Sequence, residues 1–333
     1  MKLEDVARAA GVSKATASRA LSGASGVSES TRQRVRETAD RLGFRASLAA
    51  RRLATGQAHT IGVITPSIDR WYFGSVLHGI ASACDEADYH VLLYDVGVSA
   101  SGGRDRFERF LRRGEIDGLV TITWTLGLAE SARLTELGVP VATVGEPTPH
   151  TRSFSLDDDA AGELGVDHLV SLGHRDILHL VSATDVRPFK ASSSDLRRDA
   201  YLRAMARHGH EPRPTPTVSG LETARQAALE ILARPDRPRA VVASTDDIAI
   251  GVLLAARELG IDVPRELSVT GVDDVGLVRS FGLTTVRQQP DLHGADAVRW
   301  ILQRRGSQAA APDLAHTTYP PELVVRGTTA PPA

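Results

Sequence analysis

The chain has little of what several classes of protein require. Its 333 residues contain one cysteine, Cys84, which excludes a disulfide framework and a metal site built on cysteines. No apolar run approaches the roughly 20 residues needed to cross a bilayer, and the first residues form no apolar secretory segment. We therefore expect a cytoplasmic protein with no membrane partner. Aromatic residues make up only 5%, so each of the three tryptophans is a candidate for a specific role.

Recognisable catalytic and cofactor-binding motifs are also missing. We find no Gly-x-Gly-x-x-Gly after a strand, no phosphate-binding loop, no Gly-x-Ser-x-Gly turn and no metal-ligand spacing among the 11 histidines. His168 and His174 are six residues apart, a poor match to one helix face, and we interpret them, with His179, as structural. The sequence predicts no enzyme, no cofactor and no bound metal.

The net charge of −2 is an average over two unlike parts of the chain. Residues 1–56 contain 11 Lys and Arg against 5 Asp and Glu, whereas the remaining residues contain 28 against 36. A basic amino-terminal segment on an acidic body is typical of a nucleic-acid-binding module attached to a second module.

The first 45 residues show three short helical patterns and no strand pattern. Gly11 ends the first helix, Ser13 is a good N-cap for a second at about 14–22, and Ser28 caps a third that Gly43 ends. One face of the second helix is apolar, and the other carries small polar and basic residues: Lys14, Ala15, Ser18, Arg19 and Ser22. Two helices joined by a tight turn, the second with a polar and basic face, are typical of a helix-turn-helix. A plain helical bundle is the alternative, but it gives no reason for a face rich in arginine and nearly free of acids.

Residues 47–56 form a further short helical pattern, which Gly56 ends. It spans about two turns, and isolated helices this short are marginal in water. We expect it to form only when it pairs with a second copy on DNA.

From Thr60 onward, apolar strand patterns alternate with helical patterns. Strands are predicted at 61–65, 90–95, 117–123, 139–144, 177–182, 239–244 and 267–272. Helices are predicted at 74–88, 104–114, 129–138, 159–173, 196–208, 222–234 and 246–260. Repeated strand–helix units of this kind form parallel sheets covered on both faces. The predicted fold is therefore α/β: an all-α headpiece followed by two doubly wound parallel-sheet lobes, with a ligand in the cleft between them.

An ordered series of segments resembles the LacI family of bacterial transcription repressors over nearly the full length. The strongest match is LEDVARAAGVSKATASRALSG at 3–23, followed by VSESTRQRV at 27–35. Shorter matches follow from residue 61 onward: IGV at 61–63, DD at 157–158 ahead of Gly162, HLVSLGH at 168–174, DDIAIG at 246–251, GVDD at 271–274 and LTTVRQ at 283–288.

The resemblance implies a homodimer whose headpieces bind a near-palindromic double-stranded DNA operator, and whose lobes, like those of periplasmic binding proteins, hold a small-molecule effector, commonly a sugar or a nucleobase. The implied domains are a headpiece at 1–46, a hinge helix at 47–57, one lobe from 58–156 and 289–317, the other from 157–288 and 318–327, and a tail at 328–333. The sequence shows no leucine-heptad helix for a tetramer. A periplasmic sugar receptor is the alternative, but the basic headpiece argues against it.

In the family, residues at the positions of Lys14, Ala15 and Arg19 read base edges. An arginine there can bind guanine through two hydrogen bonds, worth about 1–3 kcal/mol of discrimination, whereas an alanine offers only its methyl group. The resemblance assigns phosphate contacts to short hydroxyl side chains: Ser13, Thr16, Ser18, Ser22, Ser28 and Thr31.

Two hinge residues are implied to act in the minor groove. Leu53 matches a leucine that wedges into the central base step, and Ala50 matches a small residue that lets the helix lie in the groove. The family usually has a proline before this helix, whereas this chain has FRAS at 44–47. We therefore expect weaker ordering of the hinge.

The resemblance also places an effector site between the lobes. Its implied residues are Arg70, Trp71, Tyr72, Arg197 and Asp273, with Trp124 as a second stacking candidate and Thr245, Asp246 and Gln288 at the rim. An arginine and an aspartate that converge on a ligand can bind adjacent hydroxyls. The alternatives are core packing for the tryptophans and a surface ion pair for Arg197 and Asp273. Gly145 stands where the family often has an acid, with Glu146 after it, and DRWYF at 69–73 replaces the usual Asn-Pro-aromatic run, so the effector cannot be copied from a relative.

Overall fold

The computed structural model describes residues 2–22, 25–44, 57–96, 116–124, 127, 132–134, 136, 138–147, 151–183, 192–304 and 315–333. The predicted hinge helix, the helix predicted at 104–114 and half of the one at 129–138 lie outside these ranges. In the described part of the chain, no helix is long and apolar enough to span a bilayer.

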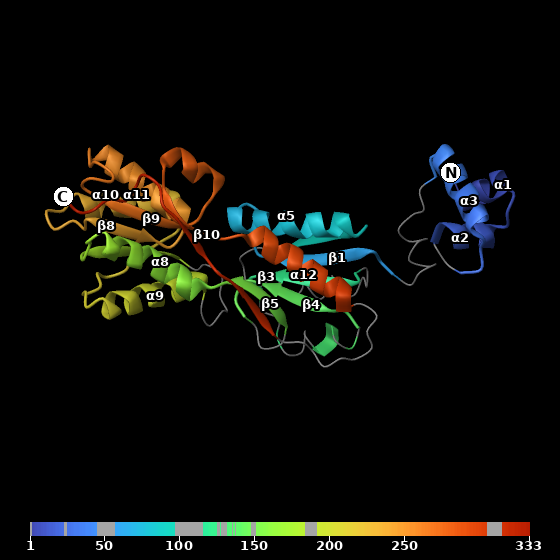
Figure 1. Ribbon diagram of the computed structural model, residues 1–333, viewed down its shortest axis with the longest axis horizontal. Coiled ribbons are helices and arrows are strands. Elements are labelled where there is room, and N and C mark those ends of the chain that lie inside the picture. Colours follow the sequence, from blue (N-terminus) through green and yellow to red (C-terminus); the bar gives the residue numbers. More distant parts are fainter. Residues whose placement is uncertain are drawn as a thin grey trace.

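The amino-terminal module consists of three helices, as predicted (Figure 1). They are α1 (Leu3–Ala9), α2 (Lys14–Ser22) and α3 (Glu29–Arg41). Their apolar faces meet in a small core that includes Val6, Ala17, Ala20, Val35 and Ala39. The side chain of Ser13 accepts a hydrogen bond from the Thr16 N–H at 3.1 Å, and that of Ser28 accepts one from the Thr31 N–H at 3.3 Å, so both serines cap helices.

The rest of the described chain forms two lobes, each around a six-stranded sheet (Figure 1). The N-lobe sheet has the order β11-β5-β4-β3-β1-β2, and all its described strand pairs are parallel. Its strands are β1 (Thr60–Thr65), β2 (His90–Asp95), β3 (Gly118–Ile122), β4 (Val141–Val144), β5 (Arg152–Leu156) and β11 (His316–Tyr319). Helices α5 (Trp71–Glu86) and α12 (Pro290–Arg304) pack side by side on this sheet.

The C-lobe sheet has the order β12-β10-β9-β8-β6-β7. Its strands are β6 (Ile177–Ser182), β7 (Thr217–Val218), β8 (Ala240–Ala243), β9 (Ser268–Asp273), β10 (Thr284–Arg287) and β12 (Glu322–Val324). Of these, β12 runs antiparallel to β10, a departure from the predicted parallel sheet, because the chain enters this edge on its last passage from the N-lobe.

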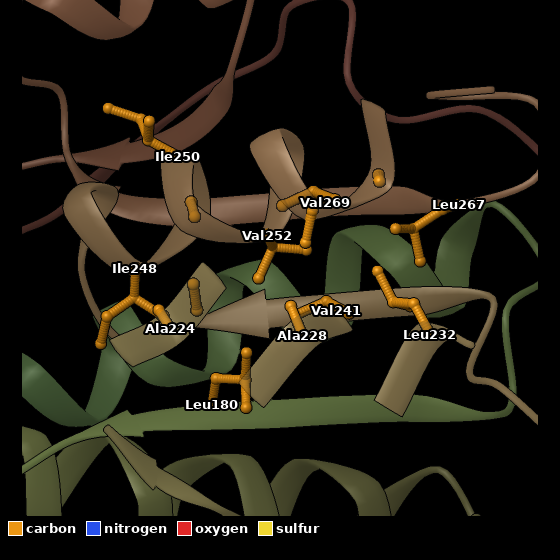
Figure 2. Packing of buried hydrophobic residues seen from close by; sticks show 14 of the residues in the cluster. Leu180, Ala224, Ala228, Leu232, Val241, Ile248, Ile250, Val252, Leu267 and Val269 are labelled. Atoms are coloured by element: carbon orange, nitrogen blue, oxygen red, sulfur yellow. The ribbon is translucent and has the colours of Figure 1, made fainter. Parts of the chain in front are cut away.

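Helices cover both faces of the C-lobe sheet. On one face lie α8 (Asp158–Ser171) and α9 (Ser193–Arg207), and on the other α10 (Leu221–Leu232) and α11 (Asp246–Glu258), followed by the 3₁₀ helix η1 (Gly276–Phe281) (Figure 1). The core between α10, α11 and the sheet is built of aliphatic side chains such as Leu180, Val241, Ile248, Val252 and Val269 (Figure 2).

The last residues, expected as a tail, are fastened to the C-lobe. The Thr328 hydroxyl donates to the Val269 carbonyl at 2.7 Å, and the Ala330 carbonyl lies 2.9 Å from Nε2 of His174. His174 therefore has a structural contact, in agreement with its interpretation from the sequence.

Candidate functional site

A cavity of about 450 Å³ lies between the lobes, beyond the carboxyl ends of the central strands. The N-lobe lines it with residues 69–73 from the turn after β1 and the start of α5, together with Thr123 and Glu146. The C-lobe contributes Ser182, Ala183, Ser192, Ser193, Ser194, Arg197, Leu221, Thr245, Asp247, Ile250, Asp273, Val275, Leu277 and Gln288.

Arg197 is the buried cation of this cavity. Its Nε lies 2.8 Å from a carboxylate oxygen of Asp158, and its Nη1 donates to the Ser244 carbonyl at 2.7 Å. Both side chains of the ion pair are less than one-tenth exposed. The guanidinium is therefore fixed on two sides by elements of the C-lobe.

Asp273 ends β9 with a φ of +136°, a conformation that costs a non-glycine residue energy and is concentrated at functional sites. Its carboxyl group accepts a hydrogen bond from Nε2 of Gln288. Burial, together with the charge of Asp246, raises the pKa of Asp273 to about 8, so it holds a proton at neutral pH. The Oε1 atom of Gln288 is buried and has no hydrogen-bond partner among the described residues.

Glu146 connects the two lobes across the cavity. It follows β4 in the N-lobe, and its carboxylate accepts a hydrogen bond from the Ser193 N–H at 3.2 Å. Ser193 is the first residue of α9, so the carboxylate lies at the positive end of that helix. Burial nevertheless raises the pKa of Glu146 above its usual range.

Three consecutive aromatic residues begin α5. The rings of Tyr72 and Phe73 meet edge to face with centroids 5.5 Å apart, and Trp71 lies beside them in the cavity lining. Burial raises the pKa of Tyr72, so its hydroxyl stays protonated and can donate a hydrogen bond. Together they give the N-lobe side of the cavity an apolar surface.

The structure brings most of the predicted effector residues to this cavity: Arg70, Trp71, Tyr72, Arg197, Thr245, Asp273 and Gln288. It places Trp124 elsewhere, against the buried Ile64 and Leu119 of the N-lobe. Asp246 is fully buried under the site, where it accepts hydrogen bonds from Thr285 and from the Val275 N–H. The effector role of all nine residues stays a prediction.

Sequence reasoning missed several residues of the lining. Asp247, rather than Asp246, faces the cavity, because successive residues of a helix point about 100° apart. Glu146 was visible only as a departure from the family pattern. No motif in the sequence pointed to the serines at 192–194, because their approach to the cavity depends on how the two lobes meet.

The second candidate surface is the outer face of α2. Lys14 is well exposed and pairs with Glu4 at 2.7 Å, and Arg19 is also exposed. Ala17 and Ala20 on the opposite face are fully buried, so the helix is held by its apolar side and presents its polar side. Ala50 and Leu53 lie outside the described residues.

Comparisons with known proteins match two parts of the chain to family models. Residues 2–47 match the family model described as bacterial regulatory proteins, lacI family, and residues 166–329 match a periplasmic binding protein-like domain. The HTH-type transcriptional regulator reg1 of Streptomyces lividans is 32% identical over 99% of this chain and 96% of its own. Catabolite control protein A of Priestia megaterium is 30% identical over 90% of this chain and 91% of its own.

Solved structures include the same arrangement of modules. The lac repressor dimer bound to operator and the anti-inducer ONPF is 27% identical, with a TM-score of 0.84 over 99% of both chains. A LacI transcriptional regulator from a Rhodococcus species is 29% identical, with a TM-score of 0.68 over 82% of this chain and 98% of its own.

Proposed function

Because this chain belongs to the lacI family of bacterial regulatory proteins and is a helix-turn-helix transcriptional regulator, we propose that it is a cytoplasmic repressor. Its affinity for operator DNA is controlled by a sugar. The sugar binds between the lobes, and the DNA-binding form is a homodimer on a near-palindromic site.

The DNA part of the proposal is supported by the amino-terminal module. The lac repressor, whose structure is similar over the full length of this chain, is seen as a dimer on its operator. In this chain Lys14 and Arg19 stand exposed on α2, where Arg19 can read guanine in the major groove. The caps Ser13 and Ser28 stand at helix amino termini, which suit phosphate oxygens.

The sugar part rests on one observation: besides donors such as the Tyr72 hydroxyl, the cavity offers hydrogen-bond acceptors that the hydroxyl groups of a ligand can satisfy. Oε1 of Gln288 lacks a partner among the described residues, and the carboxyl groups of Glu146 and Asp247 also face the ligand space. A polyhydroxylated ligand supplies the missing donors, whereas a phosphorylated one would bring further acceptors and negative charge. The volume lies within the range of about 300–1,000 Å³ usual for small-molecule sites.

The aromatic surface of the cavity supports the same class of ligand. The C–H face of a pyranose ring is apolar and packs against aromatic side chains such as Trp71, while its hydroxyls point to the polar side. The cavity thus matches the two chemical faces of a saccharide.

The test is an operator titration with and without saccharide. A panel of D-glucose, D-galactose, D-ribose, maltose, cellobiose and lactose is first screened by thermal unfolding, because a ligand of the native state raises its stability. At least one should raise the melting temperature and change the affinity for duplex DNA from the protein's own upstream region at physiological salt. Equal affinity for a random duplex would refute the operator proposal. Phosphorylated sugars and nucleobases are screened beside the panel, and stabilisation by these alone would refute the sugar.

A further inference from the structure

Helices α8 and α9 touch directly beside the cavity, and Arg197 is the point of contact. An added methyl group at Gly162 of α8 would lie 2.8 Å from the carbonyl oxygen and 2.9 Å from Cα of Arg197, so only a glycine allows this approach. One turn earlier on the same helix, the carboxylate of Asp158 reaches Nε of Arg197 at 2.8 Å. Helix α8 thus fixes both the backbone and the side chain of this arginine.

The hydrogen bonds of Arg197 leave one corner of its guanidinium for a ligand. Nε is occupied by Asp158 and Nη1 by the Ser244 carbonyl, while Nη2 makes no hydrogen bond to any described residue. Arg197 lines the cavity, whereas Asp158 is not among the described lining residues. With Nε occupied, the guanidinium cannot bind a ligand side-on through Nε and Nη2, and what remains for a ligand is Nη2 and the second hydrogen of Nη1.

Asp158 also keeps Arg197 away from the acceptor on the other side of the site. Asp273 is close enough to influence the charge of Arg197, yet no hydrogen bond joins them. Without the carboxylate of Asp158, a buried guanidinium would lack its hydrogen-bonded anion, a costly arrangement that favours turning toward Asp273. Donor and acceptor would then satisfy each other rather than a ligand.

We propose that Asp158 is a positioning residue for effector recognition: by holding Nε of Arg197 it aims Nη2 at a ligand hydroxyl and leaves the carboxyl group of Asp273 free to hydrogen-bond another. This inference rests on the proposed sugar site and adds to it a residue that does not touch the ligand.

The experiment compares Asp158→Asn with a matched control, Asp159→Asn. Both substitutions remove one negative charge from the first turn of α8, but Asp159 is 58% exposed at its side chain and pairs with Arg203 on the surface. The probe is the panel saccharide that stabilises the wild type most, and its Kd is measured by titration calorimetry. We expect a loss of about tenfold or more for Asp158→Asn, because the amide oxygen can still accept from Nε but leaves the buried guanidinium without its counter-charge. The control should stay within about twofold, since exposed ion pairs contribute little.

A double-mutant cycle separates positioning from a general structural role. Arg197→Lys supplies an ammonium that cannot bond Asp158, Ser244 and a ligand in the same planar geometry. If Asp158 acts through Arg197, adding Asp158→Asn to Arg197→Lys should cause little further loss of affinity. Additive losses would show that Asp158 acts independently and would overturn the proposal. Where Asp158→Asn fails to fold, Asp158→Glu, which keeps the charge and shifts it by one methylene, should give an intermediate loss.

The possible failures are distinguishable. If no panel saccharide binds the wild type, the sugar site itself fails and the positioning role fails with it. If the wild type binds but Asp158→Asn matches it, or if both variants lose affinity equally, the sugar site stands and only the role of Asp158 is overturned.

Discussion

Two consecutive aspartates at the end of β9 show how strongly the surroundings of a residue decide its chemistry. Burial opposes ionisation of Asp274, but hydrogen bonds from Arg287 and Arg326 outweigh it and lower its pKa. Asp273 has no such cation in hydrogen-bond contact, and burial beside Asp246 raises its pKa to about 8. Asp274 is therefore an ionised side chain that binds two arginines of the C-lobe, whereas Asp273 is a neutral acid facing the cavity.

The raised pKa of Asp273 predicts a stability that falls with pH. Below its usual value of 3.8 the group is protonated in both the folded and the unfolded chain. Between there and about 8 the unfolded chain releases the proton while the native state keeps it, so stability from this group is lost as pH rises. Asp273→Asn has no proton to release. From pH 5 to pH 9 the melting temperature of this variant should fall less than that of the wild type. Each kcal/mol of stability that only the wild type loses corresponds to about 2–4 °C. Parallel profiles in thermal unfolding would contradict this.

At the same scale, the sequence could name the type of site but not its complete lining. Asp273 and Gln288 were predictable because each stands in a stretch that resembles the family, and Arg197 because it takes the position of the family's ligand-binding arginine. Asp246 and Asp247 were not separable, since which of two neighbouring carboxylates faces the cavity depends on the rotation of α11 against the sheet. Trp124 follows β3 as a cavity residue would, but it packs against the hydrophobic cluster of the N-lobe that includes Ile64.

At the scale of elements, the N-lobe depends on close contact between α5 and α12. An added methyl group at Gly79 would lie 1.8 Å from the Asp291 carbonyl oxygen, and one at Gly294 would lie 2.3 Å from that of Val76. Glycines on both helices thus let the backbones touch. His293 and Val298 of α12 are fully buried, so the helix is an integral part of the lobe although some 200 residues separate it from α5.

This contact predicts opposite outcomes for two substitutions on α5. Gly79→Ala forces the helices apart and should destabilise the protein by at least about 2 kcal/mol, in the range of overpacked cores. Gly74→Ala on the same helix adds a methyl group where nothing lies within 4 Å, and it should be neutral or stabilise by up to about 1 kcal/mol. Chemical denaturation of both variants measures the difference, and similar midpoints would show that the helices separate without cost.

Two strands that escaped sequence prediction share a physical reason. The predicted strands β1, β6 and β9 are fully buried and largely apolar, which gives a continuous signal. Strands β5 and β11, with the sequences RSFSL and HTTY, pair with each other through polar side chains. The Ser153 hydroxyl lies 2.9 Å from Nδ1 of His316, so these groups satisfy each other at the edge of the sheet. Such pairing cannot be recognised before the two strands are known to be neighbours.

At the scale of the whole molecule, the chain passes between the lobes three times, after β5, β10 and β11. Each lobe is thus built from segments far apart in sequence, and the cavity is closed by residues from both. The first passage is marked in the sequence by Asp157, which caps α8 directly after β5. The third passage joins β11 to β12. The sheet partners of these two short strands, β5 and β10, lie more than 30 residues away in the sequence.

The separation of charge between the modules predicts that the two binding activities respond differently to salt. DNA binding by a headpiece with 11 basic and 5 acidic residues up to position 56 releases counterions from phosphates, so operator affinity should fall about 100-fold or more between 50 and 200 mM salt. Saccharide affinity should change less than about twofold, because the ligand is uncharged and Arg197 is already neutralised by Asp158 within a buried site. Anisotropy titrations and calorimetry across this range measure both. A saccharide affinity that fell as steeply as operator affinity would mean that the ligand is anionic.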